Sequence, residues 1–165
     1  FADAPLAGVI GPDGRVDYDH PAHLDHSVDM IRSGHWGRDV TGALSGARPD
    51  DVGSGRYPPG TVTTVPQDSL VLDELHHGDV VWFVLAPGDA AAAALRREHG
   101  LMVGHAGLIV RDGGTPWLVH AASRPLPPWY EGSGVVRAPL AVYLARVERY
   151  DAVIVTRFVA RPRSR

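Results

Sequence analysis

The 165-residue sequence contains no cysteine, and this absence removes several classes of chemistry from the chain itself. Disulfide bonds and thiolate metal ligands both require cysteine. A cysteine nucleophile likewise cannot come from these residues. Because disulfides are the usual sequence sign of an oxidising compartment, the cysteine count also leaves the localisation of the protein open.

Lysine is absent as well, so every cationic side chain other than histidine is arginine, and the net charge is −3. An arginine-rich stretch ends the chain, but binding to a phosphate backbone requires a larger cationic face. Long hydrophobic runs are also missing, since none approaches the ~20 apolar residues that span a bilayer. These absences argue against a nucleic-acid partner and against a membrane span.

The first half of the sequence predicts little regular structure. Apolar residues at helical spacing, with Asp19 as cap and Gly34 as stop, predict a helix over about residues 21–33. Residues 37–59 contain many Gly, Ser and Pro, which predicts a long surface loop. Residues 62–65, followed by a proline, predict a short edge strand.

The second half carries stronger patterns. Residues 80–86 form an apolar run typical of a central buried strand, and the alanine-rich segment 89–100 predicts a helix. Two strands around the turn 111–114 predict a hairpin, and a short helix over 138–150 precedes a last strand over 151–160. At this length and composition, the elements predict one α+β domain. Its sheet is expected to be antiparallel or a partly open barrel, with helices packed on one side.

Two histidines stand on the strands of the predicted hairpin. His105 lies near the start of the first strand, and His120 lies near the end of the second. An imidazole can act as a general base, and a second polar group can fix its tautomer and ring plane. A single histidine in a buried strand is more often a hydrogen-bonded core residue. The pair favours a catalytic type of site, provided that the strand register brings the rings together.

Five short motifs surround these histidines in a fixed order: Gly78-Asp79, Gly104-His105-Ala106-Gly107, Val119-His120-Ala121-Ala122-Ser123, Tyr143-Leu144 and Val155-Thr156-Arg157. In this order and spacing, residues 72–159 resemble the NlpC-type papain-like cysteine peptidase superfamily. The resemblance is greatest to its N-acetylmuramoyl-L-alanine amidase-like branch. Residues 15–31 also resemble a Tyr-x-x-Arg-x-His segment of that branch. Tyr18 and His23 are in register there, and Pro21 replaces the arginine.

The resemblance implies a papain-like, NlpC-type fold and a thiolate nucleophile at the N-terminus of a helix. His105 would be the general base and His120 the residue that orients it. A peptide or muropeptide-like amide would be the substrate of a bacterial hydrolase that is secreted or periplasmic. Tyr18, His23 and Trp129 are predicted to bind the substrate. Trp129 and the adjacent Tyr130 fit an aromatic wall at the mouth of the site and packing over the barrel rim about equally well. No cofactor and no metal ion are expected.

The expected nucleophile is missing, and two explanations are open. In the amidase-like branch the cysteine-bearing helix lies well upstream of the Tyr-x-x-Arg-x-His segment, so the resemblance places the cysteine before Phe1. The favoured explanation is therefore that residues 1–165 are one amidase-like domain that lacks its N-terminal helices. An upstream segment or another chain would then complete it. The sheet would expose apolar surface, which predicts a partner segment or a homodimer.

The second explanation is a nucleophile-free relative. Such a protein would bind a ligand in the same cleft, or use histidine for non-hydrolytic acid/base chemistry. A separate cluster of histidines, His20, His23 and His26, is a weaker candidate for a metal site. Three residues with this spacing span too much of a helix to hold one ion together. A solvated polar helix face is favoured there.

Overall fold

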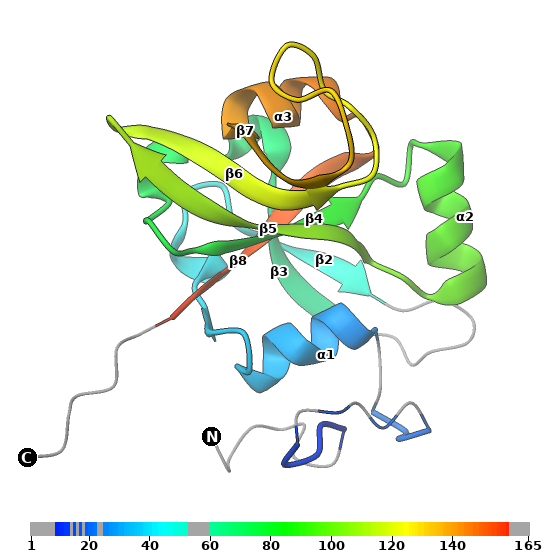
Figure 1. The fold of residues 1–165 in the computed structure, drawn as a ribbon. Coiled ribbons are helices and arrows are strands. Elements are labelled where there is room, and N and C mark those ends of the chain that lie inside the picture. The colour runs from blue at the N-terminus through cyan, green and yellow to red at the C-terminus, as the bar shows by residue number, and fades with distance from the viewer. Residues whose placement is uncertain are drawn as a thin grey trace, which may run out of the picture.

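The computed structural model describes residues 9–13, 15, 17, 19–22, 25–52 and 60–158. Within them, eight strands form one open antiparallel sheet in the order β2-β3-β8-β4-β5-β6-β7, and β1 also pairs with β8 (Figure 1). The strands are β1 (Arg38–Asp39), β2 (Arg48–Val52), β3 (Gly60–Pro66), β4 (Val80–Leu85), β5 (Val103–Asp112), β6 (Thr115–Ala122), β7 (Gly134–Pro139) and β8 (Tyr150–Arg157). The α-helices are α1 (His26–Ser33), α2 (Ala90–His99) and α3 (Leu140–Arg146), with short 3₁₀ turns at Thr41–Ala43, Gln67–Ser69 and Leu72–Glu74. The predicted α+β class with an antiparallel sheet is confirmed.

Capping residues set the ends of the first two helices. The Asp25 carboxylate accepts from backbone N–H groups of the first turn of α1, so this helix begins later than the predicted start after Asp19. Gly34 ends α1 and Gly100 ends α2, both in the left-handed conformation, and Asp89 caps the start of α2. The predicted stop at Gly34 and the predicted helix over residues 89–100 are confirmed. In the described part of the chain, no helix is long and apolar enough to cross a membrane.

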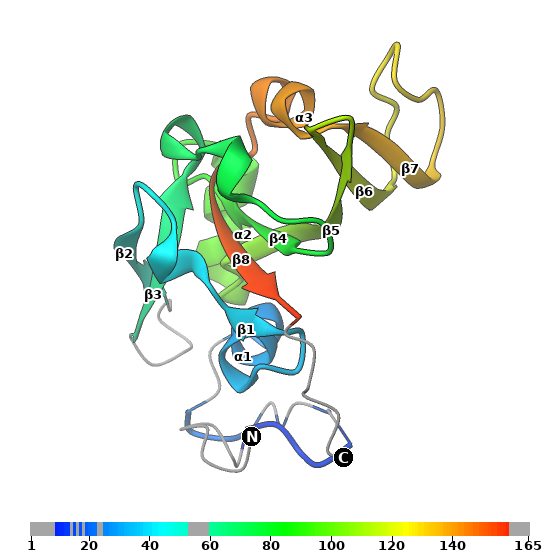
Figure 2. The ribbon, with the colours of Figure 1, turned by 90° about the vertical axis from the view of Figure 1, so that its left-hand side faces the viewer.

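The sheet is apolar on both faces, and helices cover both. Side chains of β4 point alternately into two clusters, so that Phe83 joins the first and Trp82 the second. Tyr143 of α3 and Ala92 of α2 pack in the first cluster, whereas Val28 of α1 packs in the second. Figure 2 shows α3 and α1 on opposite sides of the sheet. The prediction that the helices pack on one side is wrong, because a central strand buried on both faces needs two covers.

Two further expectations about strands are corrected, and one strand was not predicted. The loop predicted over 37–59 contains β1 and β2, and the predicted edge strand is β3, which pairs with both β2 and β8. The edge is instead β2, whose sequence RPDDV has little intrinsic strand preference but tolerates proline at the sheet margin. At the opposite edge, β7 follows a Gly- and Pro-rich segment and was not predicted. Tertiary pairing, rather than local pattern, makes these edge strands.

An ion pair between a buried carboxylate and a partly exposed arginine joins the start of β4 to the end of β8. Asp79 is fully buried, and its carboxylate accepts from Arg157 Nε at 2.7 Å and from Nη2 at 2.8 Å. The backbone N–H of His76 donates to the same carboxylate at 2.7 Å. The hydrogen bond to Asp79 raises the pKa of Arg157. The Gly-Asp motif and the arginine that ends the last strand therefore form one structural clamp.

Apolar side chains are exposed on the second face of the sheet, beyond the area that α1 covers. Trp36, Leu108 and Val135 are 48%, 47% and 81% exposed, and they border a hollow of about 450 Å³. Its walls include Trp82 and Ala106 from the neighbouring strands. Exposed apolar patches of this kind are typical of interaction surfaces. The expectation of a partner segment or a homodimer stays a prediction.

Candidate active site

A β-bulge places His105 over the core. Phe83 of β4 pairs with His105 of β5, but the next residue, Val84, pairs with Val103, so Gly104 is the extra residue. A Cβ atom at Gly104 would lie 2.5 Å from Leu85 Cδ2, which explains why glycine occupies this position. Bulges often redirect side chains at functional sites. Here the bulge leaves the His105 ring 5.8 Å from the Phe83 ring.

Gly107 makes room for the second histidine. A Cβ atom at this position would lie 2.9 Å from the Val119 carbonyl oxygen and 3.0 Å from His120 Cβ.

Because a Cβ atom at position 107 would meet β6, we expect Gly107→Ala to push this strand away and to lower the free energy of unfolding by about 1–3 kcal/mol. Chemical denaturation measures the effect. Gly88→Ala is the control, since nothing lies within 4 Å of a Cβ there, and equal stability losses in the two variants would contradict this role of Gly107.

The two predicted histidines lie in direct contact. Nε2 of His105 is 2.8 Å from Nδ1 of His120, and the rings are nearly perpendicular, with centroids 5.0 Å apart. His120 is 5% exposed, whereas His105 is half-buried and so more accessible. The sequence left the register of the hairpin open. The structure places both rings on the face that α3 covers.

Tyrosines enclose the histidine pair. Tyr143 of α3 contacts the His120 ring edge-on at 4.9 Å, and Tyr150 of β8 stacks on the His105 ring at 6.2 Å. From the loop between β6 and β7, the Tyr130 hydroxyl oxygen lies 3.3 Å from His120 Nε2. Sequence reasoning placed Tyr143 in a motif but assigned no role to Tyr150. It placed Tyr130 beside Trp129 at the mouth of the site, but the contact of Tyr130 with His120 depends on the path of the loop, which no local pattern gives.

Burial keeps the pair neutral. It lowers the pKa of His105, and burial together with the adjacent His105 lowers the pKa of His120 to about 4. Both imidazoles are therefore uncharged at neutral pH, and a hydrogen bond between them uses one N–H. A neutral imidazole that is oriented by a second polar ring has the properties of a general base.

The lowered pKa of His120 predicts a pH-dependent stability. In the unfolded chain this imidazole has its ordinary pKa of about 6.5, so below that pH the unfolded state binds a proton that the folded state does not bind until about pH 4. The free energy of unfolding should fall by about 2–3 kcal/mol over this window because of His120. His120→Gln should show a shallower decline in urea denaturation between about pH 7 and pH 4.5 than the wild type. His99→Gln, an exposed histidine of α2, controls for loss of a histidine, and parallel declines for all three proteins would contradict the prediction.

Of the other predicted site residues, Trp129 is the one that lies within the described part of the chain. Tyr18 and His23 lie outside the described residues. Trp129 is 40% exposed and contacts Trp117 edge-on at 5.7 Å, so its predicted role in substrate binding stays a prediction. His20 accepts from the backbone N–H of Ala22. In the part of the chain that the structure describes, no group of three metal-ligating side chains is found.

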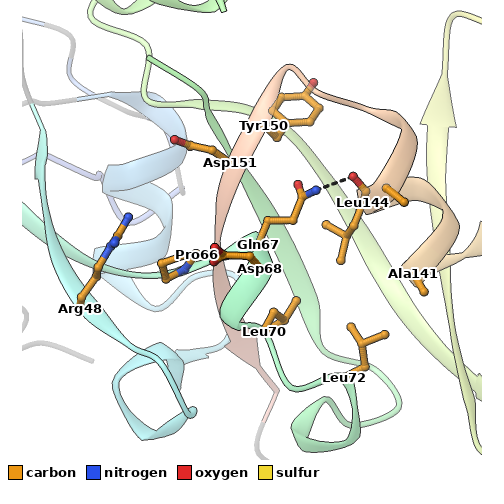
Figure 3. A pocket seen from close by; sticks show the side chains of 11 residues that line it. Arg48, Pro66, Gln67, Asp68, Leu70, Leu72, Ala141, Leu144, Tyr150 and Asp151 are labelled. Carbon is orange, nitrogen blue, oxygen red and sulfur yellow. Dashed lines mark hydrogen bonds between the residues drawn. The ribbon is translucent and has the colours of Figure 1, made fainter. Parts of the chain in front are cut away.

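A hollow of about 610 Å³ lies between the end of β3, α3 and the start of β8 (Figure 3). Tyr150, which stacks on His105, forms part of its wall. Gln67 donates to the Leu144 carbonyl oxygen across it, and Arg48 and Asp151 carry charges at the rim. This hollow offers polar and aliphatic contacts, and Tyr150 links its wall to the candidate base His105.

The fold is that of N-acetylmuramoyl-L-alanine amidase structures. Two crystal structures of an N-acetylmuramoyl-L-alanine amidase from Bacteroides uniformis superpose with a TM-score of 0.61 and 20% sequence identity. In both, the match covers 92% of this chain, and it covers 70% and 71% of the respective amidase chains. A candidate xylanase from Bacteroides fragilis superposes with a TM-score of 0.57 and 19% identity, over 90% of this chain and 72% of that one. No protein-family model matches the sequence, and no curated protein matches it. At such identities the shared feature is the fold, and function must be argued from the site.

Proposed function

We propose that the chain carries the general-base part of an amidase or peptidase site that acts on a peptide or muropeptide-like amide. His105 is the base, and His120 orients it. The observation that carries the proposal is the 2.8 Å contact between His105 Nε2 and His120 Nδ1 in a largely buried, neutral pair. The amidase-like fold and the NlpC-type motifs of the sequence support the same reaction class.

The proposed reaction uses a cysteine thiol as the nucleophile, which comes from outside these 165 residues because they contain none. His105 takes the thiol proton, and the thiolate attacks the amide carbonyl carbon. The C–N bond then breaks as His105 returns the proton to the leaving nitrogen, which leaves a thioester. His105 next takes a proton from water, and the resulting attack releases the carboxylic acid and restores the thiol.

The site chemistry favours an amide over a glycoside, although one structural neighbour is named for xylan hydrolysis. Glycosidases mostly use a pair of carboxyl groups about 5–9.5 Å apart. The pair at the centre of this site consists of two imidazoles. Imidazole pairs suit the transfer of a proton from a thiol or to a leaving amine.

A nucleophile-free relative is the second candidate, and the absence of cysteine from the 165 residues is the observation that favours it. In that case the cleft binds a ligand, or His105 moves a proton without forming an acyl-enzyme. The two candidates share the same pair of histidines. They differ in whether amide cleavage occurs at all.

A substrate comparison tests the proposal. The complete natural protein is incubated with an N-acetylmuramoyl peptide and, separately, with a xylo-oligosaccharide, and the products are identified by mass spectrometry. The proposal predicts a free peptide amine and a new carboxylate from the first substrate and no cleavage of the second. New reducing ends from the oligosaccharide, or intact amide after prolonged incubation, would overturn it.

A further inference from the structure

Tyr130 lies on the side of His120 that faces away from His105. Its hydroxyl oxygen is 3.3 Å from His120 Nε2, whereas His120 Nδ1 faces His105. The Tyr130 and His120 rings meet edge-on, with centroids 5.7 Å apart. Both ring nitrogens of the buried His120 therefore have a polar partner.

The loop between β6 and β7 holds Tyr130 in place. The backbone N–H of Leu126 donates to the Tyr130 carbonyl oxygen at 2.9 Å, and the Tyr130 N–H donates back to Leu126 at 3.2 Å. Arg146 of α3 donates to the carbonyl oxygen of Pro127 at 2.6 Å, which ties the loop to the helix. The position of the phenol is thus set by several contacts.

The hydrogens of the three side chains can be ordered in two ways, because a neutral imidazole carries one N–H. In the first order, His105 Nε2–H donates to His120 Nδ1, and His120 Nε2–H donates to the Tyr130 oxygen. The Nδ1 atom of His105 is then bare. In the second order each hydrogen bond is reversed, Tyr130 donates to His120, and His105 Nδ1 carries the hydrogen.

The first order is the one that lets His105 accept a proton. A protonated His105 has donors on both nitrogens, so its Nε2–H needs a bare Nδ1 on His120. The hydrogen of His120 must then be on Nε2, where the Tyr130 oxygen accepts it. Tyr130 is half-buried, so its own O–H can donate to water while its oxygen accepts from His120.

We propose that Tyr130 is a positioning residue that accepts the Nε2–H of His120 and thereby keeps Nδ1 of His105 as the bare, basic nitrogen. The effect on turnover rests on the proposed function, whereas the hydrogen positions are a property of the folded chain. Among the described residues, the other titratable groups that contact the pair are Tyr143 of α3 and Tyr150 of β8. Burial raises the pKa of all three tyrosines, so each keeps its hydroxyl hydrogen at neutral pH.

Nitrogen-15 NMR of the full chain, at a pH where both histidines are neutral, tests the hydrogen order directly. The nitrogen shifts distinguish a protonated ring nitrogen from a bare one. We expect Nε2 of His105 and Nε2 of His120 to be protonated and both Nδ1 atoms to be bare. A bare Nε2 on His120 in the wild-type protein would overturn the proposal without any variant.

Tyr130→Phe removes the acceptor and keeps the ring. Because the buried N–H of His120 then lacks an acceptor whenever His105 is protonated, we expect the pKa of His105 to fall by about one pH unit and the turnover at neutral pH to fall about tenfold. KM should change little. Tyr143→Phe removes a hydroxyl from another ring that contacts His120 and is the matched control for the pKa of His105, which it should leave within about 0.2 pH unit.

An unchanged pKa of His105 in Tyr130→Phe would overturn the role of Tyr130. The outcome is separable from that of the proposed function. If the hydrogen order and the pKa change are as expected but the complete natural protein cleaves no amide, the proposed function fails and the role of Tyr130 in ordering the pair stands.

Discussion

We expect His105→Ala, made in the complete natural protein, to lower the turnover of an amide substrate by about 10²–10⁴-fold, the usual contribution of a general base. Nε2 of this imidazole contacts His120 Nδ1, and His105 is half-buried rather than fully buried. Without it, no side chain in the pair can take a proton from the nucleophile in the geometry proposed. A steady-state assay on an N-acetylmuramoyl peptide measures the loss.

The fold should survive this substitution, because His105 is half-buried and the bulge that carries it is set by backbone pairing with β4. Thermal unfolding monitored by circular dichroism checks this. His76→Ala is the matched control, since His76 is an exposed histidine outside the site, and it should keep wild-type turnover. Retained turnover in a folded His105→Ala protein would remove His105 from the reaction.

The largest effect on stability is expected at the clamp between Asp79 and Arg157. Arg157→Ala leaves a fully buried carboxylate without its counter-ion, which typically costs about 3–5 kcal/mol. For a chain of this length, this corresponds to a fall of about 10 °C in Tm. Urea denaturation and calorimetry measure the two quantities. Since the clamp joins β4 to β8, the loss should appear as cooperative unfolding of the sheet.

Arg97→Ala provides the comparison, because its ion pair with Glu98 lies on the surface, with both side chains more than half exposed. Exposed pairs contribute about 0–1 kcal/mol. The double variant Asp79→Ala/Arg157→Ala has no unpaired buried carboxylate at this site. Its loss in the free energy of unfolding should therefore be smaller than the sum of the losses in the two single variants. A loss in Arg157→Ala no larger than that in Arg97→Ala would show that the clamp does not hold the strands.

The central part of the fold could be predicted because local patterns and tertiary packing agree there. The continuous apolar run of β4, the capped helix α2 and the glycine turn of the β5–β6 hairpin each have a strong local signal. The edges could not be predicted in this way. The strand β2 contains a proline and two aspartates and exists through its pairing with β3.

The candidate site, too, could be predicted only in part from the sequence. His105 and His120 stand out in the sequence because motifs on consecutive strands surround them. The bulge at Gly104 and the close approach at Gly107, which set how the rings meet, depend on contacts with Leu85 and β6 that only the folded chain reveals. Tyr130 joins the pair from a long loop, and no periodic pattern encodes the path of such a loop.

The central claim is that His105 serves a cysteine that lies outside these residues, and alkylation tests it most directly. The complete natural protein is treated with iodoacetamide, assayed on an N-acetylmuramoyl peptide, and mapped by peptide mass spectrometry. The account predicts that activity disappears in proportion to the labelling of one cysteine, and that His105→Ala slows this labelling, because the imidazole favours the reactive thiolate. A protein that stays fully active, with no labelled cysteine, would contradict the account.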